Sequence, residues 1–169
     1  MGVTAPSSGA AALEAEGFRF VVPVVPRADD FDRQGHLNNA AIVRIFNDLR
    51  IQYVYDRIGE RWGAHLGAEG LVVVAAEAHV LYESEGLPSE EYVGAMRYVR
   101  REGRAAIIDQ RLVEASSGRP VARGWFVQLL ARAGSVVDWP DFYFALVERV
   151  EGRAIEQRPS NRRPWGPGE

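Results

Sequence analysis

The sequence predicts an α+β domain in which one long helix packs against a curved antiparallel sheet. One long segment repeats apolar residues with helical spacing, and four later segments have strand character and are separated by turn residues. Because one helix precedes a run of strands, the order favours a layer of helix on sheet.

The first predicted element is a strand over residues 18–27. Phe18, Phe20 and Val22 place apolar side chains at every second position, which is the period of a strand. Pro23 has no backbone N–H to donate, so it places this strand at a sheet edge or a bulge.

The long helix is predicted over residues 39–58. Its apolar face contains Ile42, Ile45, Phe46, Leu49 and Tyr53. Asn38 or Asn39 caps the start of this helix, and Gly59 takes a left-handed conformation at its end.

Four further strands are predicted after a glycine-rich link at residues 60–70. They cover residues 71–83, 90–101, 104–114 and 120–132. Turn residues separate the last three, which therefore form a meander. A short helix over residues 139–150 follows, with Asp138 as its cap and Pro140 in its first turn.

The chain of 169 residues is expected to hold one domain, over residues 18–150. Residues 1–17 are rich in Ala, Ser and Gly, and residues 151–169 are rich in Pro, Arg and Gly. Both ends are predicted to be disordered tails.

The composition excludes several classes of function. The net charge of −3 gives no reason to expect a nucleic-acid partner. The chain has no cysteine, which removes disulfides and thiolate catalysis, and no lysine, which removes Schiff-base chemistry. No apolar run approaches the length of a membrane span, and the N-terminus does not resemble a signal peptide. We therefore expect a cytoplasmic protein with no membrane partner.

Polar residues crowd into residues 29–39, directly before the long helix. This segment holds three carboxylates, a glycine, a histidine and two asparagines. A helix N-terminus offers unpaired N–H donors that suit a developing oxyanion, and a carboxylate beside it acts as a base or a nucleophile. The alternative interpretation is structural, because an Asp before a helix is commonly a loop or cap residue.

The run Asp30-Phe31-Asp32-Arg33-Gln34-Gly35-His36-Leu37-Asn38-Asn39-Ala40 resembles a motif of hotdog-fold acyl-CoA thioesterases, in their 4-hydroxybenzoyl-CoA thioesterase-like branch. Phe46, Arg50 and Tyr53 match the continuation of that motif. The resemblance covers about residues 18–130. It implies a hotdog fold, in which a curved antiparallel sheet of about five strands wraps one long central helix.

The resemblance also implies hydrolysis of an acyl-CoA or acyl-carrier-protein thioester. It assigns the catalytic carboxylate to Asp32, as nucleophile or general base, and the oxyanion donor to the backbone N–H of Asn39. Gly35 would let the backbone approach the thioester. No cofactor is implied, since CoA enters as part of the substrate. Ile42 stands where the family often has Tyr, and Asn47 where a Glu is frequent.

Other candidate residues are assigned more loosely. His36 either orients Asp32, contacts substrate or packs within its loop. Arg100, Arg101 and Arg104 flank a turn, where they either bind the phosphates of CoA or form a solvated face. With no Cys and three His in the chain, no metal site is expected.

Two alternative functions follow from the same fold. One is a non-catalytic module that binds an acyl group or another ligand. The other is an acyl-thioester hydratase or dehydratase, whose members resemble an Asp followed five residues later by His. Here His36 follows Asp32 by four positions, with no proline between them. Because the strands carry apolar residues on both faces, we also expect a homodimer joined edge to edge, or a homotetramer.

Overall fold

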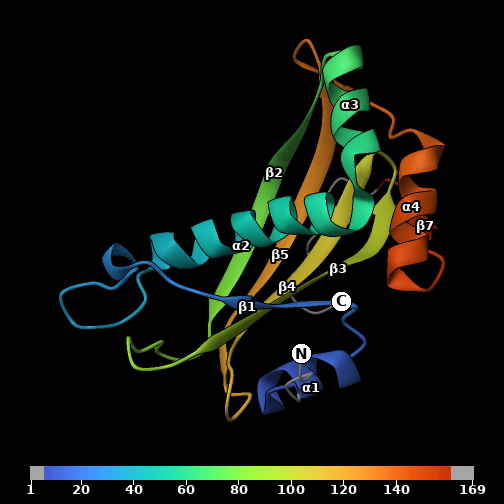
Figure 1. Ribbon diagram of the computed structural model, residues 1–169. Helices are drawn as coiled ribbons and strands as arrows, with labels where there is room; N and C mark the ends of the chain where they lie inside the picture. Colours follow the sequence, from blue (N-terminus) through green and yellow to red (C-terminus); the bar gives the residue numbers. More distant parts are fainter. Residues whose placement is uncertain (1–5, 161–169) are drawn as a thin grey trace. The chain divides into compact units, whose positions relative to one another are not determined.

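The computed structural model describes residues 6–160 of the chain (Figure 1). Its helices are α1 (Ser8–Ala15), α2 (Asn39–Tyr53), α3 (Glu60–Glu69) and α4 (Asp141–Glu151), with a 3₁₀ turn η1 (Ala28–Asp30) and a π-helical segment η2 (Val54–Ile58). Its strands are β1 (Phe20–Val24), β2 (Leu71–Tyr82), β3 (Tyr92–Glu102), β4 (Ala105–Glu114), β5 (Pro120–Arg132), β6 (Ser135–Val137) and β7 (Glu156–Arg158).

The described strands form one sheet in the order β1-β3-β4-β5-β2. β1 pairs antiparallel with β3, and Pro23 lies opposite Val93 on this outer strand, as the sequence predicts. β6 adds an antiparallel pair to β5, and β7 adds a parallel pair to β3. The α+β prediction is therefore confirmed, and two short strands join the five that were expected.

Contacts between Cα atoms divide the chain into two compact units. The first comprises Met1–Ile51, Val80–Arg97 and Gln110–Gly124, and the second comprises Gln52–His79, Tyr98–Asp109 and Trp125–Glu169. One domain over residues 18–150 stays a prediction.

In the first unit, α1 lies beside the outer strand β1 (Figure 1). The apolar cluster beneath it contains Leu13, Phe18, Val93, Ala95, Val113 and Ala115. Gly9 lets the helix approach the sheet closely, because a Cβ there would lie 2.8 Å from the carbonyl oxygen of Glu114. Residues 8–15 are therefore helical, and the expectation of a disordered tail is wrong for this segment.

The first unit also holds the middle of α2 against β4. Gln110 is fully buried; its Nε2 donates to the carbonyl of Phe46 (2.7 Å), and its Oε1 accepts from Nη1 of Arg50 (2.9 Å). These bonds satisfy the buried amide, so they fix the helix on the strand and leave little unpaired polarity.

In the second unit, α3 and α4 meet through aromatic rings. The ring centroids of Trp62 and Tyr143 are 4.2 Å apart, and those of Trp139 and Tyr143 are 5.0 Å apart. At the end of α4, buried Glu151 accepts from the hydroxyl of Tyr53 and from the backbone N–H of Tyr98, both at 2.9 Å. Burial, and then the charge of Glu151, raises the pKa of Tyr53.

Three predictions at the later elements need correction. Residues 60–69 form α3, although Gly63 and Gly67 lower its helical propensity, because Trp62 is anchored in the aromatic cluster. Pro140 occupies the cap position of α4, and Asp138 does not cap it. Residues 156–158 form β7 within the segment that was expected to be disordered, and residues 161–169 lie outside the described part of the chain.

Candidate functional site

Asp32 lies in a tight loop between η1 and α2. Its Oδ1 accepts hydrogen bonds from the backbone N–H of Gln34 (2.8 Å) and of His36 (3.2 Å). The backbone closes the same loop, because the N–H of Asp32 donates to the carbonyl of His36 (2.9 Å). Gly35 sits in this loop with a φ of +82°, a conformation that favours glycine.

The two carboxylate oxygens of Asp32 have different surroundings. Oδ1 holds the loop, whereas Oδ2 accepts no hydrogen bond from any residue in the described part of the chain. The N–H of His36, followed by that of Gln34, holds the pKa of Asp32 below its usual value. This exposed side chain is therefore a carboxylate at neutral pH, with one oxygen open to solvent.

The start of α2 presents donors beside this loop. Asn38 caps the helix, because its Oδ1 accepts from the N–H of Ala41 (2.8 Å). The N–H of Asn39, at the first helical position, donates to no group within residues 6–160. This N–H is one of the donors that a helix start leaves unpaired, so it is available to an oxyanion.

A cavity of about 580 Å³ joins these groups to a second segment of the first unit. Its lining includes Asp32, His36, Asn39 and Ile42 on one side and residues 82–85 on the other. Its volume lies within the range of ordinary ligand pockets. The structure therefore brings together the loop, the helix start and the end of β2.

The wall at residues 82–85 is fixed from both sides. On the side of the loop, Nε2 of His36 lies 3.4 Å from Oε2 of Glu85. On the other side, Arg119 donates to the hydroxyl of Ser84, to the carbonyl of Glu85 (2.7 Å) and to the carboxylate of Glu90 (2.5 Å). Arg119 therefore holds the wall through the hydroxyl of Ser84 and the backbone carbonyl of Glu85.

Asp30 has a structural role, in agreement with the alternative interpretation that an Asp before a helix is a loop or cap residue. It is buried, its carboxylate accepts from the N–H of Arg27 (2.6 Å), and it forms an ion pair with Arg44 of α2. Its backbone carbonyl accepts from the N–H of Asn38 (2.9 Å). These contacts fix the loop to the helix.

Sequence reasoning missed the wall residues Tyr82, Glu83, Ser84 and Glu85, which line the cavity, and Arg119, which holds them. The sequence separates residues 82–85 from Asp32 by roughly fifty positions, and only strand pairing brings them close. No local pattern marks them. The acidity of Glu83 and Glu85 was the one available signal.

Arg100, Arg101 and Arg104 lie in the second unit, and each has an intramolecular contact. Nε of Arg100 donates to Oε1 of Glu102 (2.5 Å), and the guanidinium of Arg101 stacks 4.2 Å above the ring of Phe144. Nε of Arg104 donates to Oδ1 of Asp138 (3.0 Å). A role for these arginines toward CoA phosphates stays a prediction.

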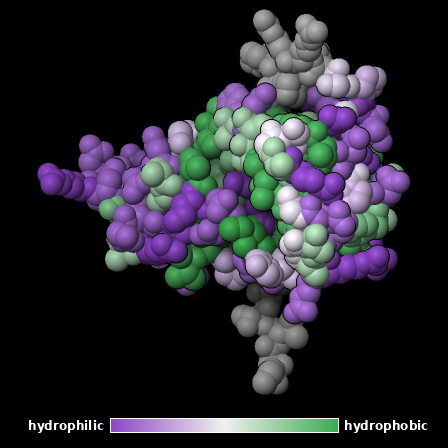
Figure 2. All heavy atoms as spheres, turned by 90° about the horizontal axis from the view of Figure 1, so that it is seen from above, coloured by the Kyte–Doolittle hydropathy of each residue, from purple (hydrophilic) through white to green (hydrophobic). Residues whose placement is uncertain are grey.

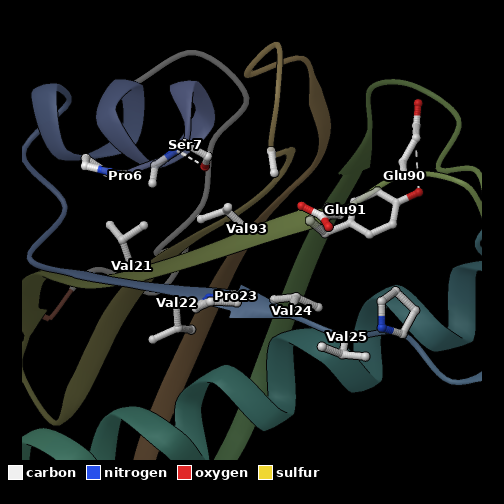
Figure 3. A pocket seen from close by; sticks show the side chains of 14 residues that line it. Pro6, Ser7, Val21, Val22, Pro23, Val24, Val25, Glu90, Glu91 and Val93 are labelled. Atoms are coloured by element: carbon white, nitrogen blue, oxygen red, sulfur yellow. Dashed lines mark hydrogen bonds between the residues drawn. The ribbon is translucent and has the colours of Figure 1, made fainter. Parts of the chain in front are cut away.

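A second cavity, of about 570 Å³, lies between α1 and β1 (Figure 3). Val21 and Val93 border it, and Glu90 stands at one end, where its carboxylate accepts from the hydroxyl of Tyr92 (3.0 Å). Because this lining is mainly apolar, and because the polar residues before α2 line the other cavity, we take the cavity at Asp32 as the candidate active site.

Two further properties concern residues 6–160 alone. They contain no group of three or more His, Cys, Asp or Glu side chains arranged to hold a metal ion. None of their helices has the length and apolar character that crossing a bilayer requires.

Comparison with protein families identifies the superfamily of the chain. A model of the thioesterase-like superfamily matches residues 26–147, which include the loop, the helix and most of the sheet. The chain belongs to the thioesterase-like superfamily. The resemblance noted at residues 30–40 is therefore confirmed. No curated protein matched the chain.

Solved structures support the same family and fold. A thioesterase from Thermus thermophilus, complexed with coenzyme A and Zn, is 26% identical, with a TM-score of 0.71 over 83% of this chain and 99% of that one. A hypothetical protein from Staphylococcus aureus in complex with CoA is 12% identical, with a TM-score of 0.71 over 89% and 92%. A thioesterase superfamily protein from a Jannaschia species is 19% identical, with a TM-score of 0.69 over 92% and 99%. The hotdog fold is thus confirmed.

Proposed function

We propose that this protein hydrolyses acyl-CoA or acyl-carrier-protein thioesters to a free acid and a thiol. Membership of the thioesterase-like superfamily and the likeness to a CoA-complexed thioesterase support thioester hydrolysis in general. One observation carries the finer proposal. Asp32, with an unbonded carboxylate oxygen, and Asn39, with an unbonded N–H, line the same cavity.

In the proposed reaction, the N–H of Asn39 donates to the thioester carbonyl oxygen. Oδ2 of Asp32 either attacks the carbonyl carbon, giving an anhydride that water opens, or takes a proton from attacking water. In both routes the C–S bond breaks, and the thiolate leaves with the electron pair and takes up a proton. A preorganised donor of this kind contributes about 2.7–4 kcal/mol.

The neighbouring residues have supporting parts in this proposal. Gly35 gives the loop the shape in which Oδ1 of Asp32 is fully engaged, so only Oδ2 is left for chemistry. His36, beside Glu85 at the edge of the cavity, is a candidate contact for the substrate. Ile42 lines the same cavity and adds apolar surface for an acyl group.

The substrate thiol is proposed to be CoA or a carrier protein, and no separate cofactor is required. Among the three arginines at the β3–β4 turn, the Arg104 side chain is 54% exposed, so it can exchange Asp138 for a phosphate with the least rearrangement. Arg100 and Arg101 remain in the proposed phosphate site with it. A cytoplasmic location stays a prediction from composition.

Thiol release from a panel of acyl-CoAs tests the proposal. We expect Asp32→Asn to lower kcat/KM at least about 100-fold, because the variant lacks the anionic oxygen. The matched control is Asp29→Asn, which removes an exposed carboxylate from the same loop and should leave the rate unchanged.

Other outcomes of that assay separate the alternatives. Hydrolysis that survives Asp32→Asn contradicts the role of Asp32. Binding of acyl-CoAs without thiol release from any of them favours the non-catalytic module. Loss of the double bond of a 2-enoyl-CoA, again without thiol release, favours a hydratase.

We further propose that the protein forms a homodimer, or a tetramer of two dimers, through the edge strand β2. Along this strand, exposed apolar side chains include Val72 (55%), Val74 (38%) and Leu81 (42%). Green apolar atoms reach the surface between purple hydrophilic ones in the space-filling view (Figure 2). An outer strand with apolar side chains is a ready template for pairing with a second chain.

A further inference from the structure

The charges that line the cavity at Asp32 are unbalanced. Its lining holds three carboxylates, on Asp32, Glu83 and Glu85, against the single imidazole of His36 and no arginine. All four residues belong to the first unit. A substrate that enters this cavity therefore meets a surplus of negative charge.

No arginine lines the cavity: Arg33, in the loop itself, is exposed and lies outside the lining, and two further arginines that hold the wall and the loop do not neutralise the surplus. Arg119, the cation that holds the wall, directs its hydrogen bonds to Ser84, to the backbone carbonyl of Glu85 and to the carboxylate of Glu90. Arg44 is paired with Asp30 and Asp48. Both guanidinium groups are therefore committed elsewhere.

Neither glutamate of the wall is paired with an arginine within residues 6–160. Glu85 has His36 as its partner, but its side chain is 70% exposed, so its charge stays hydrated and acts on the cavity through water. Glu83 makes a backbone bond, from its N–H to the carbonyl of Val121 (2.8 Å), and its carboxylate has no partner among the described residues.

Resting on the proposed hydrolysis, we infer that Glu83 and Glu85 determine specificity by excluding acyl groups that carry a negative charge close to the thioester carbonyl. The substrates are then thioesters of neutral or cationic acyl groups. The helix start attracts anions in general, so without the glutamates a second carboxylate on the substrate would compete for the N–H of Asn39.

The same charges also act on the product. Hydrolysis converts a neutral thioester carbonyl into a carboxylate beside Asp32, and like charges at short range repel. The glutamates do not exclude the transient oxyanion from the cavity in the same way, because the oxyanion accepts a hydrogen bond directly from the N–H at the helix start. The wall therefore favours release of the acid.

Two matched pairs of CoA thioesters test the inference on the full chain. Isovaleryl-CoA carries methyl groups where malonyl-CoA carries carboxylate oxygens, and butyryl-CoA carries a methyl group where β-alanyl-CoA carries an ammonium. At low salt we expect kcat/KM for malonyl-CoA to be at least about tenfold below that for isovaleryl-CoA, and β-alanyl-CoA to equal or exceed butyryl-CoA.

The double variant Glu83→Gln/Glu85→Gln removes the two charges and keeps the size and hydrogen-bonding capacity of the side chains. It should raise kcat/KM for malonyl-CoA about tenfold and leave isovaleryl-CoA within about twofold. The control Glu14→Gln/Glu91→Gln removes the same charge from exposed positions outside this cavity, and it should change neither value. If the double variant does not fold, the single variants Glu83→Gln and Glu85→Gln are measured in its place.

The outcomes for the inference and for the proposed function are distinct. Equal turnover of malonyl-CoA and isovaleryl-CoA by the wild type overturns the inference while hydrolysis stands. So does a difference that persists in the double variant. If no thioester is hydrolysed, the proposed function fails. Calorimetric binding of malonyl-CoA and isovaleryl-CoA then decides the inference, with equal dissociation constants overturning it.

Discussion

At the scale of single residues, the loop before α2 divides its acidic side chains by role. Asp30 is buried and paired with Arg44, so it holds the loop to the helix. Asp32 is exposed and has one unbonded oxygen. Burial and pairing therefore separate a structural carboxylate from a proposed reactive one only two positions away.

The pH dependence of Asp32 follows from its hydrogen bonds. The backbone N–H groups of His36, Gln34 and Gly35 favour the charged form, so the pKa of Asp32 lies below the ordinary value of 3.8. The carboxylate form, which the proposed mechanism requires, is present above that lowered pKa and is lost as the pH falls through it. We expect kcat/KM to stay constant as the pH is lowered from about 7 to about 5. The carboxyl carbon of Asp32, followed by NMR, should titrate with a midpoint below 3.8; a midpoint at or above this value contradicts the geometry.

The residues of the loop could be predicted because their pattern is local. The spacing of Asp32, Gly35, Asn38 and Asn39 before an apolar helix is readable in one stretch of sequence, and the cap at Asn38 is confirmed. Glu83 and Glu85 could not be predicted in the same way. They reach the cavity because β2 ends there, and neither residue has a local partner that marks it.

At the scale of elements, the β4–β5 turn connects stability with the wall of the cavity. Glu114 accepts four hydrogen bonds, from the N–H and hydroxyl groups of Ser116 and Ser117. These bonds lower the pKa of Glu114 to about 2, with the hydroxyl of Ser117 as the largest cause. Arg119, which holds the wall, follows this turn directly.

Glu114→Gln should therefore destabilise the protein in a pH-dependent way. Hydrogen bonds to a charged acceptor are stronger, so we expect a loss of about 1–3 kcal/mol in the free energy of unfolding at neutral pH. Because the folded pKa is depressed, this stabilisation is complete above the ordinary value of 4.5 and is lost as the pH falls toward about 2.

Urea unfolding of the wild type and the variant at several pH values measures this difference. The exposed Glu91→Gln in the same unit is the control and should cost little. A difference between wild type and Glu114→Gln that stays constant from about pH 7 to about pH 3 would show that the charge of Glu114 is not the cause.

Elements also show where local sequence signals fail. The strands and α2 were predicted because period and turn residues agree along several positions. α1 and α3 were not, because each contains glycine and few strongly apolar residues. Their helicity depends on anchors that other elements supply: the cluster around Leu13 for α1, and the rings around Trp62 for α3.

At the scale of the whole molecule, the exposure of β2 is the reason for expecting a homo-oligomer. β2 ends the strand order of the sheet, and most of its side chains are exposed. Single exposed apolar residues are ordinary on a protein surface, but several of them along an edge strand are not. The proposed dimer covers these residues.

Light scattering at micromolar concentration tests the assembly. We expect a mass of twice or four times 18.7 kDa for the wild type. Val72→Lys/Val74→Lys places charges on the outer strand and should shift the mass toward the monomer. The matched control is Val25→Lys, at an exposed valine (87%) outside β2. A monomeric wild type would contradict the dimer.

The two oxygens of the Asp32 carboxylate differ in their hydrogen bonds, and this difference has a consequence for how a substitution at this position would change function. One oxygen maintains the loop and the other is free, so an asparagine at this position can offer its amide oxygen to the same two N–H groups. The loop then keeps its shape, the cavity keeps its walls, and the oxygen that we propose to be reactive is replaced by an uncharged NH₂. In the proposed mechanism, a single exchange of oxygen for nitrogen at this position therefore separates a hydrolase from a ligand-binding protein.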